Sequence, residues 1–109
     1  MGAKSEPPAK YQGFIARFPK LGQAWALCAE AGKEGPLSER TARLLKLAMS
    51  MAALREGAVH SGVRKALDLG INREEIEQIV SLLPGTIGFP ATAAVYTWVQ
   101  DVLAKRKKG

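Results

Sequence analysis

The chain has 109 residues, of which 47% are hydrophobic, with a formal net charge of +6 and a single cysteine. A chain of this length forms one small domain (1–109), and folding buries only about 60 to 70% of the surface that the unfolded chain exposes. Its core is therefore modest, and association between subunits would add to it. One cysteine excludes an internal disulfide, and no apolar run approaches the ~18 residues that span a bilayer. The N-terminal segment lacks the hydrophobic stretch of a signal peptide, so we expect a cytoplasmic protein with no membrane partner.

The positive charge is concentrated at the two ends of the chain. Residues 105–108 read Lys-Arg-Lys-Lys, and Lys4 and Lys10 lie in a proline-rich N-terminal segment. Terminal charge of this kind usually forms a solvated tail. No aromatic stacking platform, zinc-ligand spacing or helix-turn-helix pattern accompanies it. We therefore expect no nucleic-acid partner, and flexible ends at residues 1–8 and 105–109.

The spacing of apolar residues predicts an all-α domain of about six helices and no strand. Five of these helices are expected over residues 9–18, 21–32, 38–55, 72–83 and 90–105, and one more carries His60 and ends at Gly70. On the second helix, Cys28 lies at helical spacing with Leu21 and Trp25, so we expect it to be a buried small hydrophobe.

Capping residues mark three helix boundaries. Ser38 is a predicted N-cap, and Asn72 followed by Glu75 three residues later fits a capping box. Gly57 is expected to bend or end the long helix before the helix that carries His60. Gly62 costs that helix roughly 0.5–1 kcal/mol relative to alanine, which indicates a tight helix crossing or the close approach of a ligand.

His60, the only histidine, lies in the middle of an apolar helical face. At about 100° per residue, Glu56, His60 and Arg64 project from the same side of the helix, so a carboxylate, an imidazole and a guanidinium share one stripe. Two interpretations remain open. The three side chains form a functional site, or His60 is a hydrogen-bonded core residue and Glu56 complements the positive N-terminus of its helix.

Three segments in this order resemble the carboxymuconolactone decarboxylase family, whose relatives include the AhpD-type alkylhydroperoxidases: LSERTARLLKLAMSMAAL, AVHSGVRKALDLGINREEIEQIV and GFPATAAVYTWVQDVL. The resemblance covers about residues 37–104. It implies an AhpD-like helical fold, and subunits that assemble into dimers, trimers or hexamers. We expect a homo-oligomer, most simply a hexamer or a trimer.

The chain departs from the peroxidase branch of this family. That branch uses a Cys-x-x-Cys motif to make a nucleophilic thiolate, and the two cysteine positions fall at about Ala53 and Glu56. The family's acidic proton-relay residue aligns near Arg43, and the nearest carboxylate in the sequence is Glu39. A thiol peroxidase is therefore the least favoured function.

Decarboxylation of a carboxylated lactone needs a cation for the substrate's carboxylates and a proton donor for the carbon that loses carbon dioxide. Arg64 and Arg43 would bind substrate, and His60, oriented by Glu56, would be the general acid or base, because an imidazole exchanges protons near neutral pH. This lyase function has one alternative, an oligomeric protein that binds a small acidic ligand without turnover. No cofactor is implied, and one histidine without a cysteine cluster predicts no metal site.

Overall fold

A computed structural model describes residues 9–108 of the chain, and all regular secondary structure in this range is helical. The helices are α1 (Ala9–Arg17), α2 (Pro19–Ala31), α3 (Glu39–Ala52), α4 (Glu56–Asp68), α5 (Arg73–Ser81), α6 (Pro84–Ile87) and α7 (Phe89–Lys108). The all-α class is confirmed. The described range holds one helix more than expected, because the segment that begins at Pro84 forms the short α6 before α7 starts.

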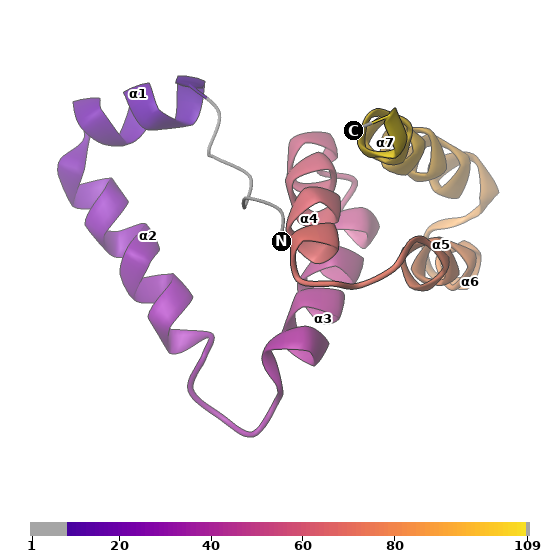
Figure 1. Ribbon diagram of the computed structural model, residues 1–109, viewed down its shortest axis with the longest axis horizontal. Coiled ribbons are helices and arrows are strands. Elements are labelled where there is room, and N and C mark those ends of the chain that lie inside the picture. Colours follow the sequence, from indigo (N-terminus) through magenta and orange to yellow (C-terminus); the bar gives the residue numbers. More distant parts are fainter. Residues whose placement is uncertain (1–8, 109) are drawn as a thin grey trace.

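The core lies among α3, α4, α5 and α7, with α4 packed between α3 and α7 (Figure 1). Its largest fully buried side chains are Leu47, Met51, Val59, Val63, Ile71, Ile76, Val95 and Val99. The buried positions of α4 follow helical spacing, so one face of this helix is buried from Val59 to Ala66. The side chains at the edge of that face reach the surface, and His60 is one of them.

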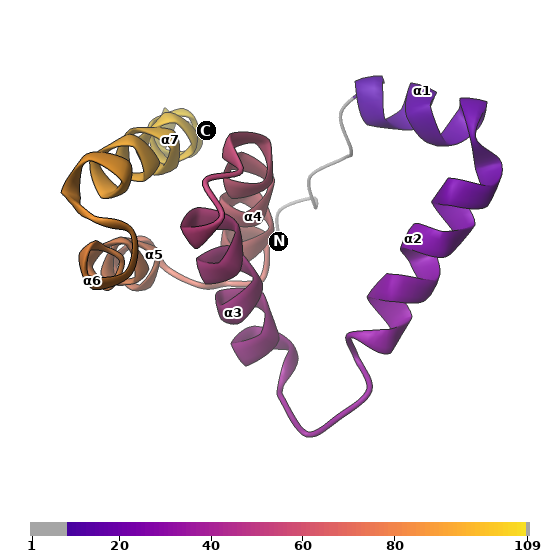
Figure 2. The ribbon, with the colours of Figure 1, turned by 180° about the vertical axis from the view of Figure 1, so that it is seen from behind.

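Helices α1 and α2 stand apart from this core, as both views of the ribbon show (Figures 1 and 2). Within the described part of the chain, no residue of α2 is buried. Cys28 is exposed, so the expectation that it would be a buried hydrophobe was wrong. Its helix does present an apolar stripe, but that stripe does not pack against the core of the same chain.

The predicted caps are confirmed. The backbone N–H of Thr41 donates to Ser38 Oγ (3.0 Å). The Asn72 and Glu75 side chains each accept a hydrogen bond from the other's backbone N–H, at 2.9 and 3.1 Å. Gly70 adopts a left-handed conformation with φ 91° just after α4, as a glycine that ends a helix commonly does.

The break between α3 and α4 differs from the expectation. It falls at Leu54, which has φ 57°, whereas Gly57 lies inside the first turn of α4. The Arg55 N–H donates to the Ser50 carbonyl (3.1 Å), so α3 ends in a Schellman-type turn. Leucine occupies the left-handed position in which that turn usually places a glycine, and this is why the sequence did not reveal it.

At the C-terminal end, α7 continues to Lys108, past the boundary expected at residue 105. Arg106, inside the segment expected to be flexible, is ion-paired with Asp68 of α4. Residues 105–108 thus belong to α7, whereas the other expected flexible residues, 1–8 and 109, lie outside the described range. No helix from residue 9 to residue 108 combines the length and the apolar character needed to cross a bilayer.

Candidate functional site

The packing of α4 against α7 places His60 opposite Asp101. His60 Nε2 lies 3.6 Å from Asp101 Oδ2 on α7 and 4.0 Å from Glu56 Oε2, one turn earlier on α4. The His60 side chain is 27% exposed, whereas both carboxylates are more than half exposed. The imidazole is therefore recessed between two negative charges that remain in contact with water.

The Nε2 atom of His60 is buried and has no hydrogen-bond partner among residues 9–108. Both carboxylate distances exceed the 2.7–3.2 Å of an ordinary hydrogen bond to nitrogen, although a protonated ring would still be attracted to both charges. A core histidine normally has its ring nitrogens satisfied, because an unpaired buried polar atom costs free energy. The Nε2 atom of His60 therefore lacks the hydrogen bond that a satisfied core histidine would make.

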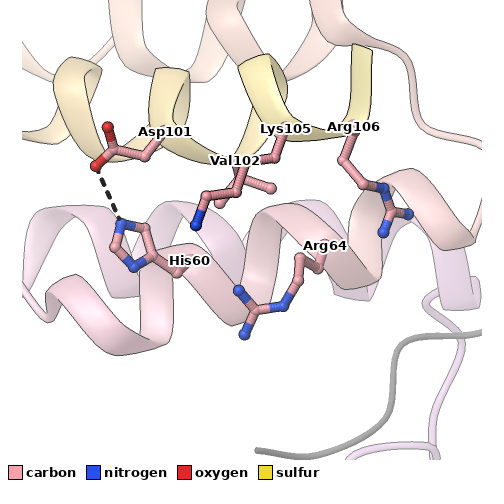
Figure 3. Close-up of a pocket in the computed structure, with 6 residues that line it drawn as sticks. All are labelled: His60, Arg64, Asp101, Val102, Lys105 and Arg106. Carbon is pink, nitrogen blue, oxygen red and sulfur yellow. Dashed lines mark ion pairs between the residues drawn. The ribbon is translucent and has the colours of Figure 1, made fainter. Parts of the chain in front are cut away.

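Next to His60 lies a pocket of about 90 Å³. Its walls are formed by His60, Arg64, Asp101, Val102, Lys105 and Arg106 (Figure 3). Arg106 is paired with Asp68, whereas Arg64 and Lys105 form no ion pair within the described range. Two cations that form no ion pair in the described part of the chain therefore lie beside the recessed imidazole, together with the Asp101 carboxylate.

The volume of the pocket limits what one chain can enclose. Sites for small molecules usually measure about 300–1,000 Å³, several times the volume found here. The pocket accommodates a group the size of a carboxylate, and the remainder of a larger ligand would extend outside it.

The structure brings together three of the four residues singled out from the sequence. His60 and Arg64 line the pocket, and Glu56 lies within ion-pair distance of His60. Arg43 does not line it. Arg43 is on α3, and its positive charge helps to lower the pKa of Lys65, whose partial burial is the larger cause.

Sequence reasoning missed Asp101, Lys105 and Arg106. These residues lie about 40 positions after the residues of α4 that they face, and no local pattern links the two segments. The only signal was Asp101 itself, the one charged residue in the sequence from Phe89 to Ala104, one helical turn before Lys105. That spacing places both side chains on one face of α7, but it does not reveal the partner helix.

Gly62 explains how α4 approaches α3. A Cβ built on Gly62 would lie 2.9 Å from Leu47 Cδ1, closer than two carbon atoms normally approach. The tight helix crossing predicted from this glycine is confirmed. Gly62 and His60 lie on opposite sides of α4, and neither Gly62 nor Leu47 lines the pocket.

Metal-binding groups do not gather in the described structure. From residue 9 to residue 108, no cluster of three or more His, Cys, Asp and Glu side chains is placed to hold a metal ion.

Comparison with protein families identifies the family of the chain. The pattern of the carboxymuconolactone decarboxylase family matches residues 19–101, and the chain belongs to this family. The match begins at the first residue of α2, well before the expected start near residue 37, and ends at Asp101. Comparisons with curated proteins and with solved structures gave no match.

Proposed function

We propose that the pocket between α4 and α7 binds the carboxylate of a small organic acid and that His60 exchanges a proton with the bound compound. The observation that carries this proposal is the buried Nε2 of His60, which has no hydrogen-bond partner in the described range and is recessed between two carboxylates in a pocket that Arg64 and Lys105 also line. Arg64 and Lys105 supply the charge that holds an anion. Asp101 and Glu56 lie on either side of the ring and orient it.

The reaction that fits this arrangement is decarboxylation of a small carboxylated lactone or a related acid. The bond from the substrate carbon to the departing carboxylate breaks, carbon dioxide leaves, and the electron pair stays on the carbon. Protonated His60 then donates its Nε2 proton to that carbon, and the ring is reprotonated from water. Arg64 and Lys105 would hold a second carboxylate that stays on the product, because a cation on the departing group would stabilise the ground state and slow its loss.

The alternative is binding without turnover. The small volume of the pocket favours it, since one chain encloses only the acidic end of a ligand. The two candidates share the anion site and differ in whether the imidazole transfers its proton.

Binding is tested first, with a panel of small mono- and dicarboxylates. Because His60 is the only histidine, its ring gives a single set of NMR signals, and these should shift when an acid binds. Arg64→Gln should weaken binding about tenfold or more, since hydrogen bonds to charged groups contribute about 1.5–3 kcal/mol. The matched control is Arg55→Gln, which removes an exposed arginine that does not line the pocket.

Turnover is tested by release of carbon dioxide from carboxylated lactones. His60→Gln should abolish release while the melting temperature stays within a few degrees and binding persists, because glutamine keeps a hydrogen-bonding group but cannot transfer a proton near neutral pH. Binding with no release by the wild type would establish the alternative. A large loss of stability in His60→Gln with unchanged acid binding would refute the site.

We also propose that the chain forms a closed homo-oligomer, a trimer or a hexamer. Large apolar side chains remain exposed on a domain of only 109 residues, and Phe89 and Tyr96 of α7 are among them. Association would remove them from water. A monomer in light scattering at micromolar concentration would contradict this proposal.

A further inference from the structure

Helices α1 and α2 form an arm, residues 9–31, whose apolar surface has no cover in the described structure. On α2, Leu21, Ala24, Trp25 and Cys28 recur at positions i, i+3, i+4 and i+7, the spacing of a helix face that packs against a partner. Leu21 is 50% exposed and Trp25 is 62% exposed. A tryptophan buries a large area when it packs, so this stripe is a costly surface to leave in water.

Helix α3 carries a second uncovered apolar stripe. Its inward side is buried through Leu47 and Met51, whereas Leu45, Met49 and Ala52, spaced i, i+4 and i+7, face outward. Leu45 is 46% exposed and Met49 is 61% exposed. The two stripes have similar lengths, and both belong to the same chain.

The total surface of the chain indicates how much cover is missing. The chain exposes 7809 Å², whereas a compact monomer of 11.7 kDa is expected to expose about 5,900 Å². Residues 1–8 can account for at most roughly 1,200 Å² of the exposed surface, the value for a fully extended segment of that mass. If they are left out of both the exposed and the expected area, about 1,000 Å² of excess surface remains. A standard interface takes about 800 Å² from each partner. The uncovered area is therefore sufficient for one stable interface.

We propose that a second copy of this chain covers both stripes, with α2 of each copy packed on the outward stripe of α3 in the other. This inference rests on the proposed homo-oligomer in its hexameric form, because a closed trimer contains no two-fold interface, and it names one interface of that hexamer. Because each copy has both stripes, one two-fold interface would cover the α2 stripe and the α3 stripe of both chains.

Two observations favour a partner copy. The family match begins at Pro19, so α2 belongs to the domain that this family shares and is not an accessory tail. The hairpin formed by α2, the link of residues 32–38 and α3 is open in both ribbon views (Figures 1 and 2). Within the link, Gly35 has φ 138°, a backbone conformation that other residues rarely adopt. Closure of α2 onto α3 of its own chain is the competing arrangement, and the experiment must separate the two.

The native Cys28 serves as the probe, because it is the only cysteine and lies exposed on the α2 stripe. A second cysteine is introduced on the α3 stripe by Leu45→Cys, and the full chain is treated with a reagent that links two thiols. Exchange between copies predicts a covalent dimer at twice the 11.7 kDa of one chain. The matched control is Lys46→Cys, one position along α3 and away from the stripe, which should give little or no dimer.

The outcomes are distinct. A cross-link inside one chain, seen by mass spectrometry as a monomer carrying one linker, would establish closure in cis and overturn the proposal. An oligomer in light scattering without a dimer selective for Leu45→Cys would overturn this interface and leave the proposed assembly intact. A monomeric wild type would overturn both.

A second pair of variants keeps the test independent of cross-linking. Trp25→Glu places a charge on the α2 stripe, and Gln23→Glu places the same charge on its polar side. We expect Trp25→Glu to raise the dissociation constant of the dimer about 30-fold or more, since a tryptophan at the centre of an interface is commonly a dominant contributor. Circular dichroism should show an unchanged fold for both, because neither side chain belongs to the core. Equal dissociation constants for the two variants would refute the interface.

Discussion

Substitution of Gly62 tests the close crossing of α3 and α4. A Cβ at this position would lie 2.9 Å from Leu47 Cδ1, so the two atoms must separate by roughly 0.6 Å or more to reach an ordinary carbon contact. Leu47 is fully buried, and its displacement has to be taken up by the packed core at a cost of about 1–3 kcal/mol. The higher helix propensity of alanine stabilises the helix by about 0.8–1.0 kcal/mol relative to glycine. Gly62→Ala should therefore destabilise the chain by about 1 kcal/mol, which lowers the melting temperature by about 4–8 °C.

Gly57→Ala is the matched control on the same helix. A Cβ at Gly57 meets no described atom within 4 Å, so this substitution should stabilise the chain by up to about 1 kcal/mol. Leu47→Ala removes the atom that clashes and costs about 2–5 kcal/mol by itself. In that background Gly62→Ala should become stabilising, and the double-mutant cycle should give a coupling of about 2 kcal/mol. If thermal and denaturant unfolding show that Gly62→Ala and Gly57→Ala stabilise the wild type equally, the crossing is not tight and the reasoning fails.

Three further predictions concern caps, pH and the thiol. Asn72→Ala removes an N-cap worth about 1 kcal/mol and should lower the melting temperature by about 4–8 °C, whereas Asn72→Asp keeps the acceptor and should lower it less. The hydrogen bond from Arg40, and then that from the Asn72 backbone, holds the pKa of Glu75 below its ordinary 4.5. This pKa is lower in the folded chain than in the unfolded one, so the ionised Glu75 side chain stabilises the fold above about pH 4.5, and this stabilisation is lost as the pH falls further. Arg40→Gln should therefore reduce the drop in melting temperature between pH 7 and pH 3. Cys28→Ser should leave the fold unchanged, and neither form should turn over peroxide, because Cys28 is the only cysteine and has no second thiol to pair with in the chain. Peroxide reduction that disappears with Cys28→Ser would contradict this.

Local chemistry could be predicted from the sequence, because its causes lie within a few residues of each other. Ser38, the Asn72–Glu75 box and the crossing at Gly62 all follow from side-chain type and helical spacing, and the structure confirms each. The all-α class follows in the same way from the repeat of apolar positions.

Contacts between distant segments could not be predicted. Asp101 meets His60 only because α7 packs on α4, and that pairing is set by the whole core. The wrong prediction that Cys28 would be buried has a related cause. The spacing of an apolar stripe shows that the stripe needs a cover, but it does not show whether the cover comes from the same chain.

The position of α4 between two neighbours links the core to the proton site. Gly62 lies against Leu47 of α3, and His60, two residues earlier on the opposite side of the same helix, faces Asp101 of α7. Over two residues a helix moves as a rigid body, so a displacement at the glycine carries the imidazole with it. The 3.6 Å separation from Asp101 is only about half an ångström longer than a hydrogen bond. A slight translation of α4 toward α7 would therefore convert a loose electrostatic contact into a directional bond, and a larger side chain at position 62, pressing on α3, would act in that direction.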